Sequence, residues 1–199
     1  YLALGSGFVV KYSVGVGTAG GGTVDGYSDL KARVIVKRGS TVISEFRDAE
    51  FAGVTAGQAY TFDASPYLTD ATAYTVQVEA QATYQGGTLM KTATAKVTMV
   101  AMALETTYSV GNGLADGGYR NDVNIPFTAK GTSGEKNIYY RVNGGQAFTL
   151  GLSAGSGVQQ KNVTIPLTQM QEGTNVVEAY AQHENSGVVS RVHYITLLK

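Results

Sequence analysis

The chain of 199 residues has no cysteine and no tryptophan, and it has only three prolines and two histidines. The absence of cysteine excludes disulfide bonds, thiolate zinc sites, iron–sulfur clusters and cysteine nucleophiles. Two histidines leave little material for histidine-based catalysis or metal binding. We therefore expect that the chain is not an enzyme and that it holds no cofactor and no metal on Cys or His ligands. Calcium binding stays an open alternative, because Asp25 with Asp29 and Asp116 with Asp122 offer two carboxylates per loop, whereas calcium takes six to eight oxygen ligands.

Charge is also scarce. Charged residues make up 15% of the chain, and 15 Lys and Arg balance 15 Asp and Glu, whereas an average protein has about 25% charged residues. A neutral chain lacks the basic excess of a sequence-independent nucleic-acid binder. The most apolar run, residues 97–104, is far shorter than the ~20 residues that a membrane-spanning helix needs. We expect neither nucleic-acid binding nor membrane insertion.

Several stretches of the first half of the chain recur in the second half. Residues 12–22 match residues 108–118 at eight of eleven positions. Three more matches follow in the same order, at offsets between 93 and 99: residues 29–37 with 122–130, 68–82 with 167–181, and 97–100 with 195–198. The nearly constant offset favours an internal duplication over convergent composition. It predicts two domains, residues 1–101 and residues 102–199.

Within each predicted domain the apolar residues alternate with polar ones. This period of two is typical of half-buried strands, and no twelve-residue segment has a helical stripe. The clearest alternating sets are Leu30, Ala32, Val34 and Val36; Tyr74, Val76, Val78, Ala80 and Ala82; and Ile138, Tyr140 and Val142. Glycine-containing turns such as Asn143-Gly144 separate them, and Asn-Gly between alternating runs is a strong hairpin signal. Short strands at this spacing predict an antiparallel β-sandwich in each domain.

Two segments carry a resemblance to a known family. In the second domain, Leu167 is followed by Gly173-Thr174-Asn175, an alternating strand and a turn at Asn185-Ser186-Gly187. In the first domain, Leu68 is followed by Tyr74 and an alternating strand. These segments resemble bacterial and phage immunoglobulin-like or fibronectin type III-like β-sandwich repeats. The resemblance implies two tandem antiparallel immunoglobulin-like β-sandwiches, with Tyr74 packed into the core at the start of a strand.

The predicted domains follow each other without a Pro, Gly or Ser spacer at residues 101–104. A flexible tether needs such residues, so we expect a stiff pair. The low charge, the 26 glycines and the start without Met favour a non-catalytic structural spacer of a larger protein. We expect that protein to be extracellular, on a bacterial cell surface or in a virion such as a phage fibre, with a role in adhesion. Its partners would be other domains or subunits, including copies of itself paired through exposed strand edges.

The alternative hypothesis is a binding module for a carbohydrate or a surface receptor, including an accessory domain of a polysaccharide-degrading enzyme. Tyrosine is the most frequent aromatic residue, and exposed tyrosine offers contact area at low entropy cost. The predicted ligand-binding residues are Tyr27, and Tyr119 with its neighbour Arg120. Tyr84 and Tyr139 are further candidates.

Two other features are interpreted as structural. His183 and His193 are expected on strand surfaces, because no third ligand has metal spacing near them. The glycine-rich residues 15–22 lack the Lys-Ser/Thr and the following helix of a phosphate loop. We interpret them as a wide loop or a bulged strand end, where glycine supplies unusual backbone angles.

Overall fold

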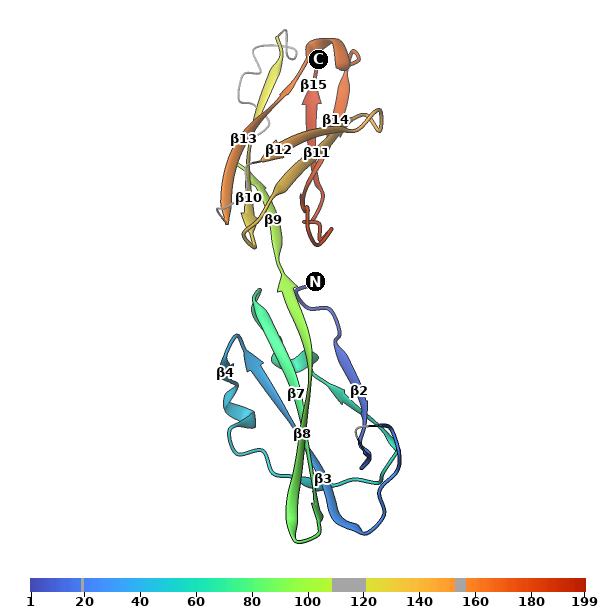
Figure 1. Ribbon diagram of the computed structural model, residues 1–199. Coiled ribbons are helices and arrows are strands. Elements are labelled where there is room, and N and C mark those ends of the chain that lie inside the picture. The colour runs from blue at the N-terminus through green and yellow to red at the C-terminus, as the bar shows by residue number, and fades with distance from the viewer. Residues whose placement is uncertain (19, 109–120, 153–156) are drawn as a thin grey trace. The chain divides into compact units, whose positions relative to one another are not determined.

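The computed structural model describes residues 1–18, 20–108, 121–152 and 157–199, and strands dominate them (Figure 1). The chain divides into two compact units, Tyr1–Met99 and Val100–Lys199, which we call unit 1 and unit 2. The helical elements of the described residues are single 3-10 turns at Ser44–Phe46 (η1), Ser65–Tyr67 (η2) and Leu167–Gln169 (η3). The predicted all-β fold of antiparallel immunoglobulin-like sandwiches is confirmed.

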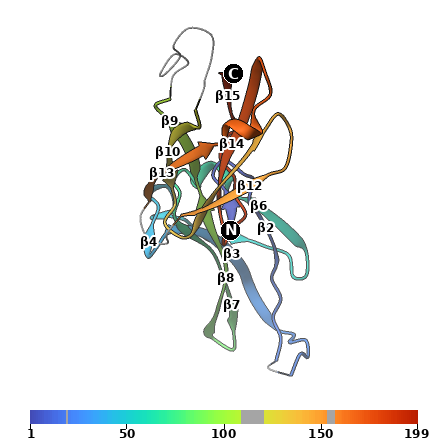
Figure 2. The same ribbon diagram turned by 90° about the horizontal axis from the view of Figure 1, so that it is seen from above.

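Unit 1 pairs one large sheet with one small sheet. Its strands are β1 (Leu2–Ala3), β2 (Val9–Ser13), β3 (Tyr27–Arg38), β4 (Thr41–Val42), β5 (Ala52–Gly53), β6 (Ala59–Asp63), β7 (Ala73–Tyr84) and β8 (Gly87–Val100). The large sheet has the order β1-β8-β7-β3-β4, with β5 also paired to β3. The small sheet is β2 beside β6 (Figure 2). The core lies between the two sheets, around Val36, Val76 and Met99.

Unit 2 packs a three-stranded sheet on a four-stranded sheet. Its strands are β9 (Met102–Thr106), β10 (Val123–Gly131), β11 (Lys136–Val142), β12 (Phe148–Leu152), β13 (Val158–Ile165), β14 (Thr174–His183) and β15 (His193–Leu198). The sheet orders are β13-β10-β9 and β12-β11-β14-β15. Three on four is a common form of the immunoglobulin-like sandwich.

Alternation along the strands places the core residues. In β10 every second side chain is buried, with Val123, Ile125 and Phe127 each no more than 3% exposed. The β11–β12 turn has positive φ at Asn143 and Gly144, of 51° and 70°. Two such residues in sequence are the mark of a type I′ turn, whose twist matches that of the flanking strands, so the predicted Asn-Gly hairpin is confirmed.

Each unit has a hydrogen bond to a buried side chain at the start of an equivalent strand. In unit 1 the Tyr74 hydroxyl at the start of β7 accepts the backbone N–H of Asp70 at 3.0 Å. In unit 2 the Oδ1 atom of Asn175 accepts the N–H of Gln171, also four residues back, at 2.9 Å. Both side chains are almost fully buried. Asn175 therefore occupies the place of Tyr74.

This correspondence differs from the offsets seen in the sequence. Residues 29–37 lie in β3, in the sheet of β7, whereas residues 122–130 fall largely in β10, which pairs with β13 in the other sheet. Tyr12 lies within β2 but Tyr108 follows β9, and residues 109–118 lie outside the described residues. The match of residues 68–82 with residues 167–181 joins β7 with β14, but it is two residues away from the register in which Tyr74 corresponds to Asn175. Alternating strands resemble one another at every even shift, so the first two matches join strands that are not equivalent. The third and fourth matches join equivalent strands, β7 with β14 and β8 with β15, and the duplication itself stays a prediction.

The Asn175 side chain gives the first test. Its four hydrogen bonds join Asn143 Nδ2, the N–H and carbonyl of Gln171, and the carbonyl of Gly173. We expect Asn175→Ala to lower the free energy of unfolding of unit 2 by about 1–3 kcal/mol, because buried partners lose their hydrogen bonds. Urea unfolding followed by NMR signals of unit 2 measures the change.

The matched control is Asn124→Ala, whose amide oxygen accepts the exposed Thr164 hydroxyl at 2.7 Å. Its partner stays in contact with water, so the loss should be within about 0.5 kcal/mol. An equal loss for both variants would contradict the role assigned to Asn175.

Candidate functional site

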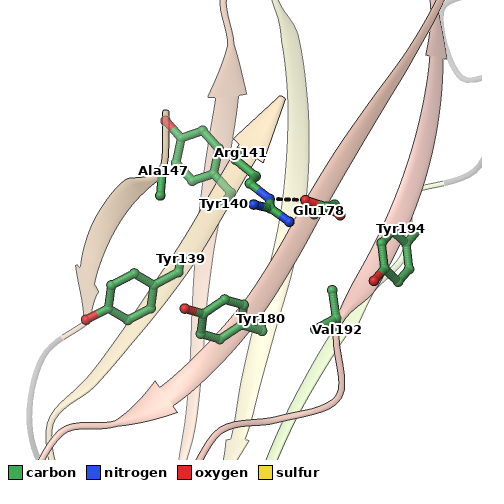
Figure 3. A pocket seen from close by; sticks show the side chains of 8 residues that line it. All are labelled: Tyr139, Tyr140, Arg141, Ala147, Glu178, Tyr180, Val192 and Tyr194. Carbon is green, nitrogen blue, oxygen red and sulfur yellow. Dashed lines mark hydrogen bonds and ion pairs between the residues drawn. The ribbon is translucent and has the colours of Figure 1, made fainter. Parts of the chain in front are cut away.

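The solvent face of the four-stranded sheet of unit 2 gathers tyrosines and one ion pair. Register places Tyr139 of β11 opposite Tyr180 of β14, and Arg141 opposite Glu178. Glu178 in turn lies opposite Tyr194 of β15. Because side chains directly opposite in a sheet share a face, all five project from the same side. We call these five residues the tyrosine face (Figure 3).

Two tyrosines of the tyrosine face form an aromatic stack. The rings of Tyr139 and Tyr180 lie with centroids 5.3 Å apart and planes 16° from parallel. Such cross-strand pairs stabilise a sheet and hold each other in one orientation. Figure 3 shows both rings standing next to each other beside the Arg141 side chain.

The ion pair joins the Nε atom of Arg141 to the Glu178 carboxylate. The hydrogen bond and the charge of Glu178 raise the pKa of Arg141, so this guanidinium stays charged. The Arg141 side chain remains half-exposed while Glu178 is more covered. The face thus offers N–H donors and carboxylate oxygens next to aromatic rings.

A shallow hollow of about 170 Å³ lies among these side chains. Ala147 and Val192 complete its lining with Tyr140. Tyr194 is 67% exposed, the largest value among the exposed apolar and aromatic residues of the described chain. The hollow is smaller than the 300–1,000 Å³ of typical drug-sized pockets, so it suits one small ring or one unit of a longer ligand.

The hydroxyl of Tyr139 has a pKa above its ordinary value. Burial raises its pKa most, followed by the negative charge of Glu184, the neighbouring Tyr180 and the hydrogen bond to Glu184. Glu184 also accepts a hydrogen bond from the Asn137 amide. The hydroxyl therefore stays protonated at neutral pH and serves as a hydrogen-bonding group.

The comparisons with known proteins find likeness among solved structures. No family model and no curated protein matches the chain. Among solved structures, the FN1–FN3 domains of chicken CNTN1 align over 86% of this chain and 56% of that chain, with 13% sequence identity and a TM-score of 0.25. This chain thus spans little more than half the length of that structure. The fold assignment rests on the strand order and register described above.

The described residues also bear on two other expectations. They include no group of three or more His, Asp or Glu side chains placed to hold a metal ion. None of the helices in the described part of the chain is long and apolar enough to cross a membrane.

Of the three predicted ligand-binding residues, the structure describes Tyr27. Tyr27 begins β3 in unit 1, where register pairs it with Tyr84 of β7. Tyr119 and Arg120 lie outside the described residues. Of the further candidates, Tyr139 joins the tyrosine face.

Four residues of the face were missed by sequence reasoning: Arg141, Glu178, Tyr180 and Tyr194. The sequence signal that could have indicated three of them is a pair of alternating patterns, Tyr139-x-Arg141 in β11 and Glu178-x-Tyr180 in β14. Only the antiparallel register places these two pairs opposite each other, and local sequence does not reveal it.

The expectation for His183 is wrong. Its side chain is buried at 2% exposure, whereas a surface position was predicted. Its Nδ1 atom lies 2.8 Å from the Ser186 hydroxyl and its Nε2 atom 3.0 Å from the Ser133 carbonyl. These partners allow a buried imidazole to satisfy both nitrogens. His193 is half-buried, and its Nε2 atom contacts the Leu104 carbonyl.

The Tyr139 hydroxyl provides a test of this electrostatic arrangement. Glu184→Gln removes a negative charge beside it, so the pKa of Tyr139 should fall towards its ordinary value while staying above it, because burial remains. NMR titration of the tyrosine ring carbons measures this shift. The control is Glu172→Gln, which removes an exposed carboxylate that pairs with Lys199. It should leave the Tyr139 titration unchanged. An unchanged Tyr139 titration in Glu184→Gln would contradict the arrangement.

Proposed function

We propose that this chain is a non-catalytic, adhesion-type module that binds a glycan through the tyrosine face of unit 2. The observation that carries the proposal is the fixed group of three tyrosines around the Arg141–Glu178 pair on one solvent-exposed sheet face. We further propose that it belongs to a larger extracellular, bacterial-surface or virion protein, as the sequence predicts.

The chemistry of the face supports a sugar ligand. The face of an aromatic ring is electron-rich and attracts groups with positive edges, such as the C–H groups on one side of a pyranose ring. The neighbouring Arg141 donates hydrogen bonds and Glu178 accepts them, which suits the hydroxyls of the same sugar. Both charged groups are already paired in the free protein, so little ordering is needed on binding.

A spacer role within that larger protein is the second candidate. Only Ala101 separates the end of β8 from the start of β9. Its N–H donates to the Thr132 hydroxyl at 3.1 Å, and its carbonyl accepts the Thr132 N–H at 2.9 Å. The connection thus contains no Gly, Ser or Pro, and both hydrogen bonds hold Ala101 within unit 2, which supports a spacer over a flexible linker.

A glycan array probed with the complete chain tests the binding proposal. We expect defined hits whose affinity falls about tenfold or more in Tyr180→Ala, because one ring of stacking surface is lost. Arg141→Ala should also weaken the same hits. Circular dichroism of each variant checks that the sandwich is intact.

The matched control is Tyr27→Ala, which removes a tyrosine from a sheet of unit 1 and should leave the hits unchanged. A loss confined to Tyr27→Ala would move the site to unit 1. No hit on a broad array would reject the glycan ligand and leave the spacer role as the better candidate.

A further inference from the structure

In the described residues, one edge of unit 1 has no neighbour where the matching edge of unit 2 carries β9, since the first strand of unit 1, β1, pairs with β8 of the other sheet. In the part of the chain that the structure describes, β2 pairs with β6 alone. In unit 2 the corresponding strand β10 pairs with β13 on one side and with β9 on the other. The correspondence follows from chain order, because β6 and β13 each run into a 3-10 turn that precedes β7 or β14.

Hydrogen bonding shows which backbone groups face the open edge of β2. The carbonyls of Phe8 and Val14 accept N–H groups from Ala64 and Gly57, on the β6 side. Neighbouring residues of an antiparallel strand point their N–H and C=O groups to opposite edges. The backbone N–H and C=O groups of Lys11 and Ser13 therefore point to the open edge, as the N–H of Thr132 points to the Ala101 carbonyl in unit 2.

Burial differs between the two units at matched positions. The last inward-facing pair before the 3-10 turn is Phe8 with Ala64 in unit 1 and Val123 with Ile165 in unit 2. Counting along the strands from there matches Val10 with Ile125 and Tyr12 with Phe127. The unit 2 residues are at most 1% exposed, whereas Val10 and Tyr12 remain half-exposed.

A groove lies where the missing strand would run. It has a volume of about 460 Å³, and its apolar lining includes Val14, Val16, Leu30, Ala80, Ala82 and Leu89. Thr18, Gln81 and Lys91 add polar groups to the lining. Residues 14–16 match residues 129–131, against which β9 places Leu104 and Met102. Leu89 is 44% exposed. The groove thus lacks what β9 supplies in unit 2.

We propose that unit 1 binds an extended peptide segment of another polypeptide, with apolar side chains at alternate positions. The segment pairs antiparallel with the open edge of β2, as β9 pairs with β10, and its apolar side chains fill the groove. Strand addition of this kind combines main-chain hydrogen bonds with pockets for alternate side chains. This inference is independent of the tyrosine face, which belongs to unit 2.

The sequence of β9 supplies the probe. A synthetic peptide of residues 100–107 is added to the complete, isotope-labelled chain, and amide signals are followed by NMR. We expect saturable shifts at β2 and along the groove. The Ser13 amide should exchange at least tenfold more slowly, because Ser13 matches Thr128, which lies opposite β9 in unit 2. The control peptide carries Asp in place of both Met102 and Leu104, and it should not bind, because a carboxylate in an apolar groove is poorly solvated.

A pair of chain variants locates the binding. Leu89→Asp places a carboxylate in the groove and should weaken peptide binding about tenfold or more. Thr92→Asp puts the same charge on an exposed position of the same strand, outside the groove lining, and should leave binding unchanged. Saturable shifts restricted to unit 2 would mean exchange with β9 and would overturn the proposal. Absence of saturable binding, or equal binding of both peptides, would overturn it as well.

Discussion

The register of β14 between β11 and β15 is the constraint on which the tyrosine face depends. Val177, Ala179 and Ala181 are fully buried on one side of β14, and Glu178 and Tyr180 stand on the other. A shift by one residue would exchange the two faces and place the polar side chains in the core. The buried alternation therefore holds the outer residues in place as firmly as it holds the core.

The start of this strand is set by a polar contact inside the sandwich. Asn175 satisfies both atoms of its amide with neighbouring groups, and Tyr74 makes the corresponding contact in unit 1. Two different side chains thus solve the same problem, which is an N–H four residues back that would otherwise be buried without a partner. The neighbouring hydrogen bond from Asn143 links this corner to the β11–β12 hairpin, so the turn and the register of the tyrosine face are connected.

Each unit has one larger sheet, and the two units differ in the smaller sheet packed against it. The three strands of the smaller sheet in unit 2 cover the core, and Phe127 and Ile165 are almost fully buried. The two strands of unit 1 leave Tyr12 and Phe62 half-exposed. The same architecture therefore has a closed form and a form with an open edge, and an open edge is a place where another strand can pair. The two surfaces arise differently. The tyrosine face consists of side chains on a sheet, and the open edge of β2 consists of backbone groups without a neighbouring strand in the described residues.

Local sequence predicted the fold class because alternation and turn chemistry are local properties. The strands around Val36, Val76 and Ile138 and the Asn143-Gly144 hairpin could all be read from the sequence. Which strands are neighbours could not, since a period of two is the same for every strand. Residues 29–37 therefore matched a strand of the other sheet, and Tyr180 was not connected with Tyr139. The burial of His183 and the open edge of β2 likewise depend on residues distant in the sequence. Sequence alone thus determined an all-β chain that is poor in catalytic residues, and tertiary pairing decided where its tyrosines meet and where a strand is missing.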